Sequence, residues 1–197
     1  DPVAEGFIAG HESAMPPAAA DAIMDLAQSC TKEADVSGLY DSFKATGLRY
    51  GARFRSVKQA WRNSDGTMIK CVLSLPDLSS LSANYHMFPP VLDGALQSAA
   101  LLSSSTESGS AQLPFSIDRV FVLPAAVGTR TCCNEYLSYL QVRERTRDTT
   151  VFDCVVANNH GVALVCLQGV YLRSSFAVGA SMSSYATTYL MARPIWT

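Results

Sequence analysis

The residues of this chain best suited to acid–base chemistry are Asp93 and Gln97, which lie four positions apart in the almost wholly apolar run 88–102. Pro89 and Pro90 precede a stretch rich in Leu and Ala, which predicts a helix that begins at the prolines. Residues four apart share a helix face, so the Gln97 carboxamide can hold the Asp93 carboxyl by a hydrogen bond. This pair predicts proton transfer to a bound substrate, with Asp93 as a general acid.

A second interpretation of Asp93 is structural. Acidic side chains are common in the first turn of a helix, where free backbone N–H groups and the helix dipole favour negative charge. Burial would raise the pKa of Asp93, whereas a helix N-terminus would lower it. The residue pattern leaves both interpretations open.

The composition predicts one folded domain with appendages. Of 197 residues, 48% are hydrophobic and 16% are charged, which is unlike a disordered tail. The net charge of −2 gives no basic footprint for nucleic acid, and no segment has the length and apolarity of a membrane span. We therefore expect neither nucleic acid nor a membrane as a partner. Because the chain does not begin with Met, we expect it to be part of a longer polypeptide.

The cysteines form no Cys-x-x-Cys pair and give no metal-binding spacing, so we expect no metal site. Most of them lie in apolar, strand-like runs, which favours buried, reduced thiols in a cytoplasmic protein. The six are Cys30, Cys71, Cys132, Cys133, Cys154 and Cys166.

The order of elements predicts an α+β fold in which an antiparallel sheet wraps a central apolar helix. We expect a short helix over 35–46, strands over 49–61 and 67–75, the helix that begins at Pro89, and strands over 113–123, 131–142, 151–157 and 162–172. The turn 158–161 joins the last two strands as a hairpin. The expected domains are 1–34, a remnant of a preceding segment and linker; 35–173, the folded domain; and 174–197, a linker and the start of a following region.

Four motifs, in this order, resemble those of the C-terminal half of a polyketide synthase dehydratase, a double hot-dog fold. Residues 47–54, Gly-Leu-Arg-Tyr-Gly-Ala-Arg-Phe, are similar to a Gly-Tyr/Leu-x-Tyr-Gly-Pro-x-Phe motif, with Ala52 in place of proline. Residues 89–97 are similar to the family's Pro-Ala-Leu-Leu-Asp-x-x-Leu-Gln stretch, although Phe88 stands where histidine is usual. Residues 113–116, Leu-Pro-Phe-Ser, and the hairpin 152–173 complete the resemblance.

The resemblance implies removal of water from a 3-hydroxyacyl thioester carried on the phosphopantetheine of an acyl carrier protein, with no cofactor bound directly. It assigns Asp93 as the acid, Gln97 as the residue that orients it or binds the hydroxyl, and Tyr50 as a neighbouring hydrogen-bonding residue. The remaining candidates are expected to contact the substrate. They are Phe54, Phe88, Pro89, Leu113, Pro114 and Phe115.

Family members also use a histidine base from the first hot-dog half. None of His11, His86 and His160 fits that motif, so we expect the histidine to come from a preceding half or from another chain, and the isolated chain to be incomplete and inactive. Two alternatives remain: a non-catalytic structural or dimerising module, and a hot-dog thioesterase. Exposed sheet edges also favour pairing into a homodimer.

Arg49, Arg53 and Arg55 alternate along the expected strand 49–61. They could contact a phosphopantetheine arm or an acidic helix of the carrier protein. The simpler interpretation is that they are ordinary outward-facing strand positions.

Overall fold

The structure is a computed structural model that describes residues 17–75, 87–102, 112–123 and 134–174. Its α-helices are α1 (Pro17–Leu26), α2 (Leu39–Ala45) and α3 (Pro89–Gln97), and its 3-10 helices are η1 (Ala27–Ser29), η2 (Ala52–Phe54) and η4 (Ser98–Leu102). The strands are β1 (Lys32–Glu33), β2 (Val57–Arg62), β3 (Met68–Ser74), β4 (Gln112–Val122), β5 (Glu135–Arg145), β6 (Thr149–Asn158) and β7 (Ala163–Ser174).

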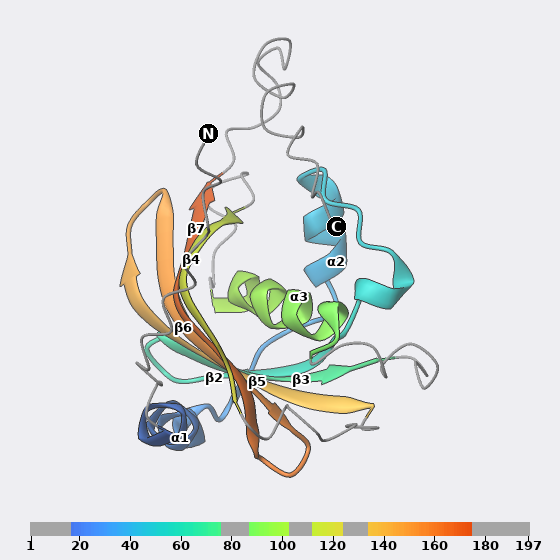
Figure 1. Cartoon of the computed structure of the whole chain (residues 1–197). Coiled ribbons are helices and arrows are strands. Elements are labelled where there is room, and N and C mark those ends of the chain that lie inside the picture. Colours follow the sequence, from blue (N-terminus) through green and yellow to red (C-terminus); the bar gives the residue numbers. More distant parts are fainter. Residues whose placement is uncertain (1–16, 76–86, 103–111, 124–133, 175–197) are drawn as a thin grey trace, which may run out of the picture.

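The strands form one antiparallel sheet in the order β1-β2-β3-β5-β6-β7-β4. The sheet curves around α3, which lies on its concave side, while α1 lies against the opposite face (Figure 1). This arrangement confirms the predicted α+β fold and its central helix. No helix within the described residues is long and apolar enough to cross a membrane.

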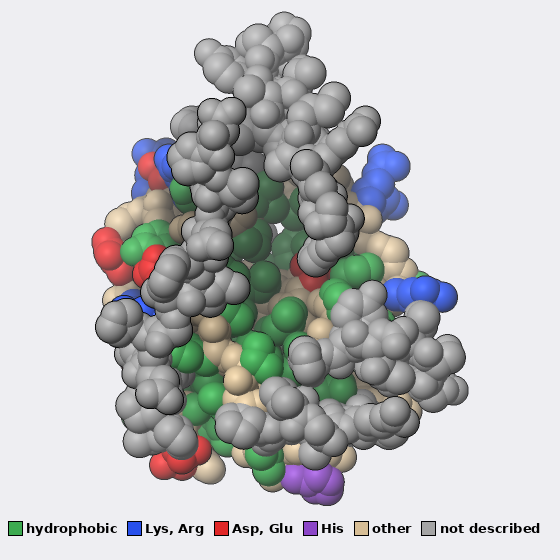
Figure 2. All heavy atoms as spheres, in the orientation of Figure 1, with side chains coloured by type: hydrophobic (Ala, Val, Ile, Leu, Met, Phe, Trp, Pro, Cys, Tyr) green, Lys and Arg blue, Asp and Glu red, His purple; other side chains and the backbone are tan. Residues whose placement is uncertain are grey.

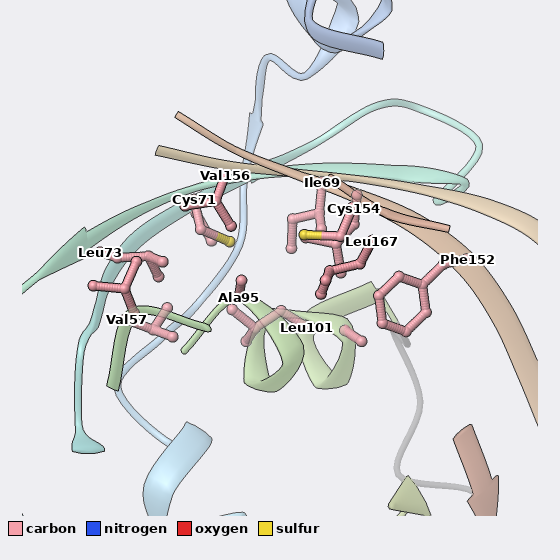
Figure 3. Packing of buried hydrophobic residues seen from close by; sticks show 14 of the residues in the cluster. Val57, Ile69, Cys71, Leu73, Ala95, Leu101, Phe152, Cys154, Val156 and Leu167 are labelled. Carbon is pink, nitrogen blue, oxygen red and sulfur yellow. The ribbon is translucent and has the colours of Figure 1, made fainter. Parts of the chain in front are cut away.

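The main core forms where α3 and η4 press against the concave face of the sheet. Val91 and Ala95 of α3 are fully buried, and so are Ile69 and Cys71 of β3. Figure 3 shows Ala95 and Leu101 facing side chains of β3, β6 and β7. The apolar periodicity of the helix that begins at Pro89 is thus explained by burial of one face on the sheet.

The sequence interpretation missed α1, which lies in the stretch expected to be remnant and linker. Ile23 of α1 and Ala27 of η1 pack with Tyr139, Val155 and Cys166 in a second apolar cluster on the convex face. The reason is that β6 is buried along nearly its whole length and therefore needs cover on both faces. The Ala-rich composition and the Pro16-Pro17 pair had favoured a linker, whereas Pro17 is in fact the first residue of α1.

Two other elements differ in extent from those expected. The first predicted helix begins at Leu39 rather than at residue 35. Of the predicted strand 49–61, only the part from Val57 onward is a strand, and Ala52–Phe54 is a 3-10 turn. The predicted hairpin turn at 158–161 is confirmed, with positive φ at Gly161.

Gly94 allows α3 to approach the chain just before β2. A Cβ at this position would overlap the buried Ser56 hydroxyl, which donates a hydrogen bond of 3.1 Å to the Pro90 carbonyl. We expect Gly94→Ala to lower the free energy of unfolding by about 1–3 kcal/mol, because overpacking forces neighbouring atoms apart. Urea denaturation of the chain measures this loss. In the Ser56→Ala/Gly94→Ala double variant the clash is relieved, so the two losses should be less than additive; strict additivity would contradict this explanation.

Candidate functional site

Asp93 lies beyond the first turn of α3, which contains no acidic residue. Its Oδ2 accepts a hydrogen bond of 2.6 Å from Gln97 Nε2, one turn further along the helix. The side chain is half-buried. The helix-cap interpretation is therefore wrong, because the carboxyl bonds to the Gln97 side chain from the middle of the helix.

The Gln97 carboxamide is buried and fixed in one orientation. Its Nε2 also donates to the Phe54 carbonyl of η2 at 3.0 Å, so both of its neighbours on that side are acceptors. Its Oε1 is buried and has no hydrogen-bond partner among the described residues. A buried acceptor of this kind is costly to leave unpaired, and a substrate hydroxyl could satisfy it.

Burial raises the pKa of Asp93, and the hydrogen bond from Gln97 opposes this rise to a smaller extent. A carboxyl with a raised pKa holds its proton at higher pH, which suits it to protonate a leaving hydroxyl. The sequence left open whether burial or the helix N-terminus decides the pKa of Asp93, and in the structure burial has the larger effect.

Two tyrosines lie close enough to Asp93 for its charge to affect them. Burial raises the pKa of Tyr50, and the negative charge of Asp93 adds to the rise. Burial, with smaller effects from Asp93 and other neighbours, raises the pKa of Tyr40 to about 12. Both phenols therefore stay protonated and can act only as hydrogen-bonding groups at neutral pH.

Tyr40 of α2 was not among the sequence candidates. Its Oη accepts a hydrogen bond of 3.0 Å from the Val57 backbone N–H, which leaves the hydroxyl proton free to be donated. Its ring packs edge-on to Tyr50 at 6.3 Å between centroids. In the sequence, Tyr40 is simply the residue after Leu39 in a short helix, and nothing in that pattern indicates a role at the site.

The other predicted site residues fall into two groups. Phe54 contributes its carbonyl to Gln97, Phe88 is half-buried directly before α3, and Pro89 is the exposed first residue of that helix. The Leu-Pro-Phe motif lies on edge strand β4, where Phe115 is 68% exposed and the Arg173 guanidinium lies 5.0 Å from its ring centroid. Substrate contact by these residues stays a prediction.

Of the three histidines, His11 and His86 lie outside the described residues. His160 is exposed in the β6–β7 turn, as predicted, and Figure 1 places that turn below the sheet, away from α3. Within the described part of the chain, the acid therefore has no histidine beside it.

The outward-strand interpretation of Arg49, Arg53 and Arg55 is wrong. Arg53 lies in η2, and the other two flank it in segments that belong to no strand. The chain leaves extended geometry here because the Phe54 carbonyl turns toward Gln97.

Replacing Gln97 by leucine should raise the pKa of Asp93 further, because the hydrogen bond that stabilises its charged form is removed. The change is measured by an NMR titration of the Asp93 carboxyl carbon. The matched control is Ser98→Ala, one residue along, whose hydroxyl bonds instead to the Gly94 carbonyl. A pKa that stays the same or falls in Gln97→Leu would contradict the assigned contact.

Comparisons with known proteins identify the family of this chain. A family model described as "Polyketide synthase dehydratase N-terminal domain" matches residues 18–181. "Polyketide synthase PksN" of Bacillus subtilis is 26% identical over 82% of this chain, and "Naringenin synthase" of Pestalotiopsis fici is 29% identical over 72%. The chain spans only 3% and 5% of these two relatives.

The fold is also that of solved dehydratase domains. The dehydratase domain from the CurK module of curacin polyketide synthase superposes with a TM-score of 0.64 at 23% identity, over 79% of this chain and 52% of that one. A dehydratase domain of a mycocerosic acid synthase-like polyketide synthase gives a TM-score of 0.65 at 21% identity, over 81% and 55%. The chain thus spans about half of these domains. Because the family model matches most of its length, the chain belongs to the polyketide synthase dehydratase family.

Proposed function

We propose that this chain is the aspartate-bearing, second hot-dog lobe of a dehydratase that removes water from a 3-hydroxyacyl thioester on the phosphopantetheine of an acyl carrier protein. The observation that carries the proposal is the half-buried Asp93, whose pKa is raised by burial and whose carboxyl is held by the buried Gln97. On the face shown in Figure 2, hydrophobic side chains gather in a hollow over the region of α3, a suitable surface for an acyl chain.

The chemistry follows from these groups. A base removes the proton from the carbon next to the thioester carbonyl, and the released electron pair forms the carbon–carbon double bond. The bond to the hydroxyl then breaks, and the proton of Asp93 passes to that oxygen to form water. Gln97 Oε1 accepts a hydrogen bond from the hydroxyl, and Tyr40 and Tyr50 serve as neutral donors beside it. Asp93 regains its proton before the next turnover.

The base is a histidine from outside this chain, carried by a preceding hot-dog lobe or by another chain. A histidine-to-phenylalanine variant and an aspartate-to-asparagine variant of the CurK dehydratase are both inactive mutants, which supports a need for both residue types. The matching family model is described as the N-terminal domain. The motifs around Tyr50, Asp93 and Phe115 favour the second lobe.

Strand β4 is the edge at which the missing lobe would add. It is the last strand of the sheet, and Phe115, Val120 and Val122 are exposed on it, whereas the opposite edge, β1, has only two residues. Unpaired backbone groups and exposed apolar side chains on one long strand favour pairing with another sheet.

A second candidate function is a non-catalytic module that shapes or dimerises the synthase. The same exposed β4 edge favours it, because a dimerising strand needs no histidine and no acid.

The test is an assay in which the chain, alone and assembled with a histidine-bearing lobe of the same synthase, receives a 3-hydroxyacyl carrier protein. Mass spectrometry of the acyl arm then detects the loss of one water. We expect product only from the assembled pair. Release of the free acid would show a thioesterase instead, and an unchanged arm with a correctly assembled pair would favour the structural module.

A further inference from the structure

One stretch of the chain is strongly cationic although the whole molecule is slightly acidic. Between residues 42 and 62 the sequence has six Lys or Arg residues and no Asp or Glu, whereas the full chain has 15 basic and 17 acidic residues. We call five of these side chains the basic rim: Lys44, Arg49, Arg53, Arg55 and Lys58. All five are exposed.

The basic rim is tied directly to the helix that carries Asp93. The Phe54 carbonyl accepts from Gln97 Nε2, and the Ser56 hydroxyl donates to the Pro90 carbonyl at the start of α3. These two contacts flank Arg55 and fix the segment against the site. In Figure 2, Lys and Arg side chains lie at the right-hand edge of this face, and others lie at its left-hand edge beside Asp and Glu side chains.

Among the residues that the structure describes, the rim cations are not paired with acidic side chains. The ion pair found within the described residues joins Arg143 to Asp153, so none of the five rim residues forms one there. Arg55 Nε donates to the Tyr50 carbonyl at 3.0 Å, and its guanidinium lies 5.5 Å from the Tyr40 ring centroid, which positions its charge beside the site. Unneutralised cations held at the mouth of a site create a positive potential that attracts an anionic partner.

We propose that the basic rim is the surface on which the acidic face of the acyl carrier protein docks. The inference rests on the proposed function, since it takes the carrier protein as the molecule that delivers the thioester. Opposite charge across an interface speeds encounter and fixes orientation. Here it would place the acyl arm over the hollow next to Asp93.

The experiment measures binding of the full chain to a phosphopantetheinylated bacterial acyl carrier protein on a biosensor, at low and high salt. Arg49→Glu/Arg53→Glu is the test variant, because Arg55 also contacts two tyrosines. Arg145→Glu/Arg147→Glu is the matched control, since both residues are exposed and the change in net charge is the same. We expect the test variant to raise Kd about tenfold or more at low salt, equal to ~1.4 kcal/mol, and the control to change it little.

If both variants weakened carrier-protein binding equally, the effect would come from net charge alone and the proposal would be wrong. Undetectable binding by the unaltered chain would also overturn it. Carrier protein without phosphopantetheine separates the protein surface from the phosphate: loss of all binding would mean that the rim recognises only the phosphate, against our inference. Turnover of the assembled dehydratase separates the two claims. No dehydration with intact, rim-dependent binding refutes the proposed function alone, and dehydration that ignores the rim variant refutes the docking surface alone.

Discussion

Asp93→Asn in the assembled dehydratase should lower kcat by ~100-fold or more, because positioned acid–base groups contribute factors of about 10² to 10⁴. Asparagine keeps the shape and can still accept from Gln97 Nε2, but it has no proton to give to the leaving hydroxyl. Binding of the carrier protein should be unaffected, so the loss should appear in kcat rather than in KM.

The measurement is single-turnover dehydration, with circular dichroism to show that the variant is folded. In the unaltered enzyme the acid-dependent step should fail as pH rises through the raised pKa of Asp93, because only the protonated carboxyl can act. In the asparagine variant, the residual rate should not show this decrease with rising pH. Unchanged turnover in Asp93→Asn would remove Asp93 from the mechanism.

The sequence predicted the hydrogen bond between Asp93 and Gln97 because the signal for it was local. Asp93 and Gln97 lie on one helix, so their spacing alone determined their contact. The Phe54 carbonyl, by contrast, meets Gln97 only because η2 folds back onto α3 across more than forty residues. Tyr40 reaches the site in the same way, through tertiary packing that no spacing in the sequence encodes.

The same distinction explains the fold. Strands β5, β6 and β7 were predicted from their strand-like apolar runs, and the hairpin between the last two from the Asn and Gly residues of 158–161, which are local features. Helix α1 was missed because its role is to cover the second face of a sheet, and that need is visible only once β6 is known to be buried on both sides. The arginines of 49–55 alternate as in a strand, but hydrogen bonds to α3 override the local preference.

A second carboxylate, Asp153, stabilises the fold, and its removal should cause a large loss of stability. It is 5% exposed on β6; its Oδ1 accepts from the Gly169 N–H at 2.9 Å and its Oδ2 from Arg143 Nε at 2.6 Å. Asp153→Ala leaves the buried Gly169 N–H without its acceptor. We expect a loss of about 3 kcal/mol, since hydrogen bonds to charged groups contribute about 1.5–3 kcal/mol each and Arg143 is partly exposed to solvent.

Asp93→Asn is the matched comparison, and we expect this substitution to increase stability where Asp153→Ala decreases it. The folded state raises the pKa of Asp93 above its unfolded value, so between the two values the folded chain binds more protons, and stability falls as pH rises. Asparagine removes this dependence, so its melting temperature should equal that of the unaltered chain in acid and exceed it by a constant amount once the pH lies above the raised pKa of Asp93. Thermal melts across that range measure both variants. A carboxylate that lowers stability when ionised yet lies on the central helix is better explained by chemistry than by folding. If Asp93→Asn were instead destabilising above that pKa, as Asp153→Ala should be at neutral pH, Asp93 would be a second structural carboxylate.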